Sequence, residues 1–266
     1  MNVLLTGYRG FIGSNLLNQI PKDWSVRYYD LLDNSNLCAS DLELDKIDWV
    51  FHIGAISSTA ETNWSKIAKH NITFSIELFE RCVDNSINFQ FSSSASVYGA
   101  STTFTETDTK SPTSYYATSK AVVEDYITYR QPSNIRYQLF RYFNVYGSGE
   151  DHKIGQSSPH TEFARQAKQS GVIKVFEGSE TFMRDFVSVD SVVDTHLKMM
   201  KSEESGVWNI GTGQPKSFMQ IAEEVAGRYN ARIEVVMFPD KLRSSYQRFT
   251  CADTNKLVKS LADIRK

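Results

Sequence analysis

The sequence predicts an α/β protein with a Rossmann-type, doubly wound parallel sheet and a smaller α/β substrate domain. Three observations carry this prediction. Strand-like and helix-like patterns alternate through the first half, a glycine-rich turn follows the first strand pattern, and the second strand pattern ends in Asp30. Such alternation is typical of βαβ units, whose right-handed crossovers build a parallel sheet.

Hydrophobic periodicity predicts the elements of the first half. Short apolar runs indicate strands, and longer segments with apolar positions at helical spacing indicate helices. The predicted strands are Asn2–Thr6, Val26–Tyr29, Trp49–His52, Phe89–Ser93 and Ile135–Phe140, and the predicted helices are Phe11–Gln19, Asn71–Asn85 and Tyr116–Tyr129.

The pattern becomes less regular after Asn144, where residues 148–159 (SGEDHKIGQSSP) are polar and glycine-rich, as in a binding loop. The later segments predict helices at Thr161–Ser170, Phe186–Met200 and Phe218–Tyr229, and strands at Val172–Phe176 and Val207–Ile210. We therefore expect a dinucleotide-binding domain from residues 1–143 and roughly 186–210 and 254–266. A substrate domain is expected from roughly 144–185 and 211–253.

Composition excludes several classes of partner. The 266 residues carry a formal net charge of −2 and no strongly basic stretch, so we expect neither nucleic acid nor an anionic membrane as a partner. No segment approaches the roughly 18 apolar residues of a membrane span. The three cysteines, Cys38, Cys82 and Cys251, lack metal-ligand spacing. They indicate reduced, mostly buried thiols in a cytoplasmic protein without a metal site.

The turn after the first strand has the spacing G-x-x-G-x-x-G, which differs from the standard G-x-G-x-x-G fingerprint of dinucleotide sites but serves the same physical purpose. Glycine allows a tight turn, lets the backbone approach a pyrophosphate, and lets the helix pack closely on the strand. The free N–H groups of the following helix then face the phosphates. The expected cofactor-binding residues of this turn are Gly7, Arg9, Gly10, Phe11, Ile12 and Gly13.

Asp30 lies where a carboxylate accepts hydrogen bonds from the adenosine ribose hydroxyls. The carboxylate would repel a 2′-phosphate, and residues 31–40 contain no Lys or Arg to neutralise one. The cofactor is therefore predicted to be NAD or NADP, with NAD favoured and Arg9 as the one nearby cation that could hold a 2′-phosphate. Asp41, followed by Leu42, is a candidate for the adenine edge.

A Tyr-x-x-x-Lys pair and an upstream serine form a catalytic group. Tyr116 and Lys120 are four residues apart on a predicted helix and so share one face. A nearby ammonium is expected to lower the pKa of the Tyr116 phenol, which can then take a proton from a substrate hydroxyl as hydride leaves. Ser94 follows a strand and offers a hydroxyl to the reacting oxygen.

With these motifs in order, the chain resembles the extended short-chain dehydrogenase/reductase family. It carries TGYRGFIGS, SSSASVYG, YATSK, RYFNVYG and RDFVSV in the order of that family. The resemblance implies a Rossmann domain, a bound nicotinamide cofactor and a nucleotide-diphosphate sugar as substrate. It places Asn71 beside the active site and Asn144 where the chain enters the sugar site. A homo-oligomer is expected by analogy.

Within this family, four segments of the chain resemble the ADP-glycero-manno-heptose 6-epimerases. The similar segments are GAISSTAE, GEDHK, VFEGSETFMRDFV and FPDKLRSSYQRFTCAD. The resemblance implies two proton-transfer groups, Tyr116 and Lys153, because each face of a transient carbonyl needs its own acid/base. The substrate-binding residues that it implies are Ser57, Glu61, Ser94, Asn144, Phe176, Glu177, Gly178, Ser179, Arg184 and Tyr246.

Other activities stay open. Residues 154–163 (IGQSSPHTEF) depart from the heptose-epimerase pattern at Gly155 and Glu162, which leaves the exact sugar undecided. A UDP- or GDP-sugar 4-epimerase or reductase would keep the same catalytic group. A 4,6-dehydratase would need an acid pair where this chain has Ser94-Ala95-Ser96. A non-catalytic dinucleotide sensor usually loses the tyrosine or the lysine, and both are present.

Overall fold

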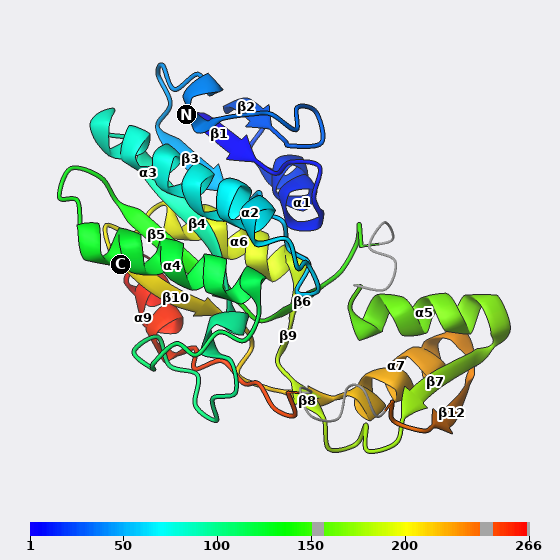
Figure 1. Cartoon of the computed structure of the whole chain (residues 1–266). Coiled ribbons are helices and arrows are strands. Elements are labelled where there is room, and N and C mark those ends of the chain that lie inside the picture. The colour runs from blue at the N-terminus through cyan, green and yellow to red at the C-terminus, as the bar shows by residue number, and fades with distance from the viewer. Residues whose placement is uncertain (151–156, 240–246, 265–266) are drawn as a thin grey trace.

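A six-stranded, fully parallel sheet forms the centre of the computed structural model, which describes residues 1–150, 157–239 and 247–264 (Figure 1). The strand order is β10-β5-β4-β3-β1-β2. The predicted Rossmann-type fold class is confirmed. The strands are β1 (Asn2–Thr6), β2 (Ser25–Tyr29), β3 (Trp49–His52), β4 (Asn88–Ser94), β5 (Tyr137–Tyr142) and β10 (Gly206–Ile210).

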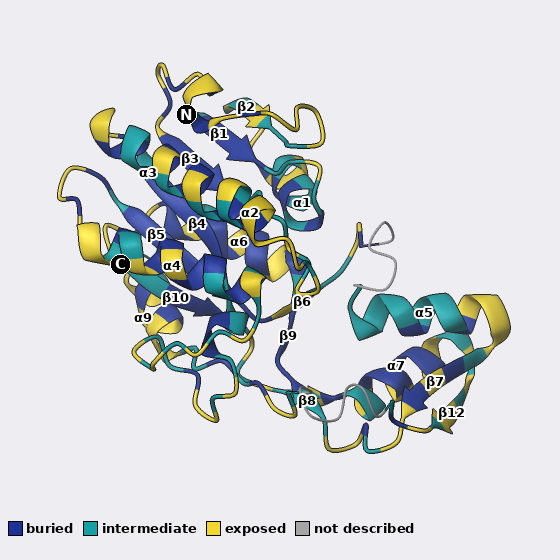
Figure 2. Ribbon diagram, in the orientation of Figure 1, coloured by how far each residue is buried: buried dark blue, intermediate teal, exposed yellow. Residues whose placement is uncertain are grey.

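Helices cover both faces of this sheet, because consecutive strand residues point to opposite faces and both sets are apolar. Leu4 of β1 packs with α3 (Phe74–Asp84) and α4 (Tyr115–Arg130) in one core. Its neighbours Val3 and Leu5 pack in a second core with α1 (Phe11–Gln19) and α6 (Val189–Met199). Figure 2 shows the sheet buried between these two layers.

The strand order places a ligand crevice between β1 and β3. The chain moves from β1 outward to β2, then returns to β3 on the other side of β1. In open parallel sheets, ligands bind outside the carboxyl ends of the strands where the order reverses in this way. Here those ends are Thr6 and His52, which pair in register.

A second, smaller lobe lies apart from the sheet (Figure 1). Its own core joins helices α5 (Pro159–Ser170) and α7 (Phe218–Tyr229) to the parallel pair β7 (Val172–Phe176) and β12 (Arg232–Val236). All four elements fall within the ranges 144–185 and 211–253 predicted for the substrate domain, whose exact boundaries stay a prediction. Three short strand pieces, β6 (Asn144–Tyr146), β9 (Phe186–Ser188) and β8 (Met183–Arg184), lead between the two parts.

The structure differs from the predicted elements mainly around the connections. The helix predicted over Phe186–Met200 is wrong at its start. Phe186–Ser188 is strand β9, which pairs with β6, and α6 begins at Val189 because the Ser188 side chain accepts a hydrogen bond from the Ser191 N–H. The predictions also missed β12, the short α2 (Trp64–Ile67) and the C-terminal helix α9 (Asn255–Asp263).

The thiols also differ from the expectation, because Cys82 is buried, Cys251 is half-buried and Cys38 is exposed. Within the described ranges, no helix is long and apolar enough to cross a bilayer. The same ranges contain no cluster of three or more His, Cys, Asp or Glu side chains suited to a metal ion.

A buried ion pair fixes α4, the predicted catalytic helix, to the sheet. The Glu124 carboxylate of α4 pairs with the Arg141 guanidinium of β5 and accepts a hydrogen bond of 2.8 Å from the Ser93 hydroxyl of β4. Both charged side chains are almost completely buried, at 1% and 3% exposed. Removing Glu124 would therefore leave the Arg141 guanidinium buried without its ion-pair partner.

We predict that Glu124→Ala lowers the free energy of unfolding by about 3–5 kcal/mol, because Arg141 loses its buried partner. Urea denaturation measures this change. Asp125→Ala removes the neighbouring carboxylate, which is 66% exposed, and should cost less than about 1 kcal/mol. Equal losses in the two variants would contradict a structural role for the buried pair.

Candidate active site

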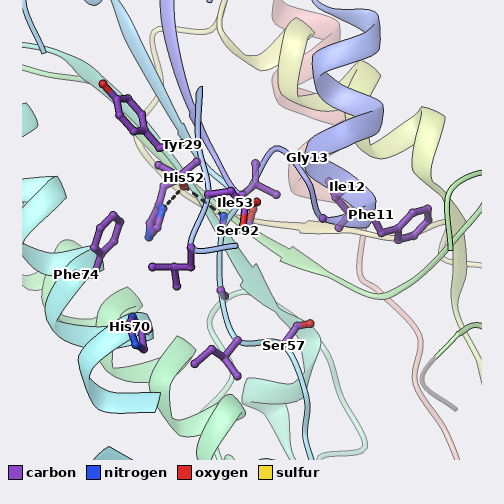
Figure 3. A pocket seen from close by; sticks show the side chains of 18 of the residues that line it. Phe11, Ile12, Gly13, Tyr29, His52, Ile53, Ser57, His70, Phe74 and Ser92 are labelled. Atoms are coloured by element: carbon purple, nitrogen blue, oxygen red, sulfur yellow. Dashed lines mark hydrogen bonds between the residues drawn. The ribbon is translucent and has the colours of Figure 1, made fainter. Parts of the chain in front are cut away.

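A cavity of about 510 Å³ opens at the predicted crevice (Figure 3). It is lined by the glycine-rich turn, by the segments that follow β2 and β3, and by residues of β4, β5 and α4. Many predicted site residues line it together, namely Gly7, Gly10, Phe11, Ile12, Gly13, Asp30, Ser57, Tyr116 and Lys120. The structure therefore brings the predicted cofactor turn and catalytic pair into one space.

The glycine-rich turn packs backbone against backbone. Gly7 has φ +76°, and a Cβ atom there would lie 2.4 Å from the Cα of Gly54. A Cβ at Gly13 would lie 2.0 Å from the Gly7 carbonyl oxygen. No side chain caps the N-terminus of α1, which begins at Phe11 after Gly10. The arrangement fits a pyrophosphate, which needs close backbone approach and helix N–H donors.

Asp30 lines the cavity at the end of β2, where a ribose was predicted. Its carboxylate accepts hydrogen bonds from the backbone N–H groups of Leu32, at 2.9 Å, and Arg9, at 3.0 Å. The remaining lone pairs of the carboxylate leave acceptor capacity for ribose hydroxyls. The Arg9 side chain does not line the cavity and instead pairs with Asp33.

Tyr116 and Lys120 lie one helical turn apart on α4 and face the same cavity. The Lys120 ammonium is 2% exposed and lies 4.5 Å from the centre of the Phe91 ring and 5.9 Å from that of Tyr116. Burial lowers the pKa of Lys120 to about 7. Its neutral form is therefore accessible near neutral pH, which is unusual for a lysine.

The predicted lowering of the Tyr116 pKa by Lys120 is wrong for this arrangement. Burial raises the pKa of Tyr116 above its ordinary value, and the only opposing influence is a hydrogen bond with the Ser94 side chain. Ser94 itself ends β4 and also accepts hydrogen bonds from the N–H and hydroxyl of Ser96. Ser94 therefore lies beside Tyr116, and the effect of burial on the Tyr116 pKa is larger than that of this hydrogen bond.

The sequence did not predict a buried chain of hydrogen bonds that lies behind Ser92 and Tyr142 in the cavity wall. Gln90 donates through its amide nitrogen to Gln138 and to the His196 carbonyl, so its oxygen must accept from His196 Nδ1, at 2.6 Å. His196 Nε2 is then the unprotonated nitrogen, and it accepts the Tyr142 hydroxyl at 2.5 Å. Ser92 in turn donates to Tyr142, at 2.7 Å.

This chain presents the cavity with hydroxyl groups of fixed orientation. Ser92 and Tyr142 both line the cavity, and burial lowers the pKa of His196 to about 3, which keeps the imidazole neutral. The motifs SSSASVYG and RYFNVYG already contained Ser92 and Tyr142, and their place near the carboxyl ends of two parallel strands was a signal for a ligand-facing position. His196 gave no signal, because its partners lie far away in sequence.

Two histidines other than His196 line the cavity directly. His52 bridges Thr6, at 2.6 Å, and Ser75, at 2.7 Å, and burial lowers its pKa to about 3. His70 lies in a π-helical segment (Ala68–Thr73), and its Nδ1 atom is buried with no hydrogen-bond partner among the described residues. π-helical turns occur often at functional sites, but their sequences carry no clear signature.

Asn71 acts one layer behind the cavity. Its side chain accepts the Ile56 N–H at 2.8 Å and donates to the Ile56 carbonyl at 3.0 Å and to the Ser119 hydroxyl at 3.1 Å. It therefore holds the loop after β3 against α4. Asn71 does not itself line the cavity, so it orients the wall rather than contacting the space.

Three predicted residues are engaged elsewhere. The Asp41 carboxylate accepts the Cys38 N–H at 2.8 Å, and Leu42 is buried in the core beneath α3. Neither residue lines the cavity, so the structure does not support the prediction that they contact the adenine of the cofactor. Glu61 accepts the Asn63 N–H at 2.9 Å and pairs with Lys66 at 2.9 Å, which is a local structural role.

The remaining predicted substrate residues lie on or near the second lobe. Asn144 begins β6 and is exposed, and Arg184, in β8, donates to the carbonyl oxygens of Met183 and Gln247. Lys153 and Tyr246 lie outside the described residues, and the described members of this set do not line the cavity. The others are Phe176 at the end of β7, and Glu177, Gly178 and Ser179 in the turn that follows it.

Proteins similar to this chain are nicotinamide-dependent epimerases and related enzymes. The family described as NAD dependent epimerase/dehydratase matches residues 3–211. A curated ADP-L-glycero-D-manno-heptose-6-epimerase from Alkalilimnicola ehrlichii is 34% identical, and the match covers 98% of this chain and 92% of that protein.

Two solved structures have the same overall fold. The ADP-L-glycero-D-manno-heptose-6-epimerase of Helicobacter pylori superposes with a TM-score of 0.87 at 25% identity, covering 98% of this chain and 90% of the other. The UDP-glucose 4-epimerase of Thermotoga maritima, solved with UDP-glucose, superposes with a TM-score of 0.86 at 27% identity, covering 98% and 93%.

The buried Lys120 predicts a pH dependence of stability in the cofactor-free protein. Its pKa is about 7 in the folded chain and roughly 10.4 when unfolded, so between these values the unfolded chain binds more protons. The free energy of unfolding of the wild type, relative to Lys120→Met, should therefore rise with pH from 7 to 10, by at most about 1.4 kcal/mol per pH unit.

Urea denaturation of both proteins at pH 7, 8 and 9 measures this difference. Comparison with Lys120→Met cancels the titration of all other groups that the two proteins share. A difference that does not change with pH would contradict the assignment of a depressed pKa to Lys120.

Proposed function

We propose that this chain, which belongs to the NAD dependent epimerase/dehydratase family, epimerises a nucleotide-diphosphate sugar by inverting C6 of ADP-glycero-manno-heptose. One observation carries the reaction class: Tyr116 and Lys120, with Ser94 bonded to Tyr116, stand in the cavity that the glycine-rich turn also lines. The heptose substrate is supported by the A. ehrlichii protein named for that activity. Its alignment covers 98% of this chain at 34% identity.

The residues present fit a nicotinamide dinucleotide. Gly7, Gly10 and Gly13, with the N-terminus of α1, would hold the pyrophosphate, and Asp30 would accept the adenosine ribose hydroxyls. Tyr116 and Lys120 would face the nicotinamide ribose. When bound, the nicotinamide supplies an acceptor and then a donor of hydride for the carbon that is inverted.

Tyr116, assisted by Ser94, would remove the proton from the reacting sugar hydroxyl. The Tyr116 phenolate oxygen would take the alcohol proton as the carbon is oxidised, and a second group would supply the proton when the carbonyl is reduced on its opposite face. The hydrogen bond from Ser94 favours the phenolate and so works against the burial that raises the pKa of Tyr116. Ser94 also offers a hydrogen bond to the reacting oxygen, which keeps it beside the phenol.

Inversion requires a second acid/base for the opposite face of the carbonyl. Lys153, which follows β6 in the chain, is proposed for this role on the resemblance to the 6-epimerases. Ser57 lines the cavity and is proposed as a contact to sugar hydroxyls. Phe176, Glu177, Gly178, Ser179, Arg184, Asn144 and Tyr246 are proposed to hold the nucleotide and sugar from the second lobe.

A UDP- or GDP-sugar 4-epimerase or reductase is the second candidate. The similarity to the UDP-glucose 4-epimerase of T. maritima, at 27% identity, favours it. In that reaction one tyrosine suffices and Lys153 would be incidental. Dehydration is disfavoured because Ser94-Ala95-Ser96 provides no carboxylic acid for a leaving hydroxyl. A cytoplasmic location and a homo-oligomeric assembly remain part of the proposal.

Incubation of the purified protein with ADP-D-glycero-D-manno-heptose is predicted to yield the L-glycero epimer, detected by proton NMR at C6. Tyr116→Phe should lower kcat by about 100- to 10,000-fold, because the proton-transfer group is lost. Tyr115→Phe is the matched control, since Tyr115 is 46% exposed and does not line the cavity. Turnover of only a UDP- or GDP-sugar would favour the second candidate, and full activity in Tyr116→Phe would contradict both.

A further inference from the structure

We propose that Asp33 determines cofactor selectivity by holding Arg9 away from the adenosine ribose, so that the site takes NAD in preference to NADP. The inference rests on the proposed use of a nicotinamide dinucleotide. The ribose end of the cavity is lined by Tyr29, Asp30, Leu31 and Leu32, and Arg9 lies within the turn that would bind the pyrophosphate. A free Arg9 guanidinium at this position would attract a 2′-phosphate.

The Arg9 side chain forms an ion pair with Asp33. Its Nη1 atom donates to Asp33 Oδ1 at 2.7 Å. Asp33 also accepts a hydrogen bond from the Tyr8 hydroxyl, and the Tyr8 ring packs against Tyr28, with 4.5 Å between ring centres. Both donors hold the pKa of Asp33 below its usual range, so the carboxylate stays charged across the physiological pH range.

The same turn fixes both carboxylates. Asp33 donates its N–H to the Asp30 carbonyl at 3.1 Å, and the Asp30 carboxylate accepts the N–H of Arg9 and of Leu32. Asp33 pairs with the Arg9 guanidinium and Asp30 binds the Arg9 backbone N–H, so the three charged groups carry a net negative charge. A 2′-phosphate entering here would meet repulsion from Asp30 and would have to displace Asp33 from Arg9, whereas a 2′-hydroxyl would need only an acceptor.

Other cations near the connection after Asp30 are engaged with main-chain atoms. Arg81 donates to the carbonyl oxygens of Ala39 and Leu42. Residues 31–45, which continue from Asp30, contain no Lys or Arg. Arg27, on the preceding strand, donates to the carbonyl oxygens of Glu43 and Asp45 at 3.0 and 2.9 Å and so fixes that connection instead. Selectivity at this end of the cavity consequently depends on whether Arg9 is held by Asp33.

Calorimetric titration of nucleotide-free protein with NAD and with NADP tests the inference. The wild type is predicted to prefer NAD, and Asp33→Asn to tighten NADP binding by about ten- to a hundredfold, the value of one charge-assisted hydrogen bond. NAD affinity should change less than about twofold. Arg9→Met combined with Asp33→Asn should abolish the gain, because the inference assigns it to Arg9.

The design separates the possible outcomes. Arg9 and Asp33 are 47% and 44% exposed, so breaking their pair costs little stability, and Asp33→Ser provides a second variant with the same prediction. Asp23→Asn makes the same charge change before β2, at the opposite end of that strand, and should leave both affinities unaltered.

Unchanged NADP binding in both Asp33 variants, or a gain that persists without Arg9, would overturn the role of Asp33 and leave the proposed function intact. A wild type that binds neither dinucleotide would overturn the proposed function and this inference with it. A wild type that prefers NADP would overturn the inference alone.

Discussion

The packing of Gly7 against Gly13 and Gly54 is the constraint on which the rest of the site depends. A side chain at Gly7 or Gly13 would place its Cβ atom 2.4 Å or less from main-chain atoms, which real structures do not tolerate. The absence of side chains lets α1 pack against the turn at Gly7, and lets that turn pack against the loop after β3. These contacts set the width of the crevice, and they put helix N–H donors beside the space that Asp30 and Lys120 also line.

The two ends of this cavity work by different physical means. The turn end consists largely of backbone donors and carries the charges of Asp30, Asp33 and Arg9 near solvent. The catalytic end is desolvated: burial lowers the pKa of Lys120 to about 7 and keeps His196 neutral. In such surroundings hydrogen bonds are strong and directional, so the Ser94–Tyr116 contact and the Ser92–Tyr142–His196 chain determine where protons can reside.

Local patterns predicted much of the fold and of the site. Asn2–Thr6 and Phe11–Gln19 have the predicted bounds, because a short apolar run and an amphipathic segment each report the burial of one element. The glycine spacing and the Tyr116/Lys120 spacing also survive in the structure, since both depend on residues that are close in sequence. Errors arose where the partner was distant, as for Phe186–Ser188, which forms a strand only because β6 lies beside it.

The unpredicted parts of the site have the same origin. Ser92, Tyr142 and His196 come from three different elements, and only the assembled sheet and α6 bring them together. The burial of the Tyr116 phenol could not be read from spacing, so the net direction of its pKa shift was mispredicted. Leu42 was assigned to the cofactor from its place after Asp41, while its apolar side chain serves the core.

Epimerisation by transient oxidation and reduction at one carbon is the central claim, and isotope exchange tests it most directly. The reaction would be run in heavy water with ADP-D-glycero-D-manno-heptose, and the product analysed by mass spectrometry and proton NMR. Hydride transfer to and from the same bound nicotinamide predicts an inverted product with no deuterium on C6, because hydride does not exchange with solvent. Incorporation of one deuterium at the inverted carbon would show exchange through a proton and would contradict it.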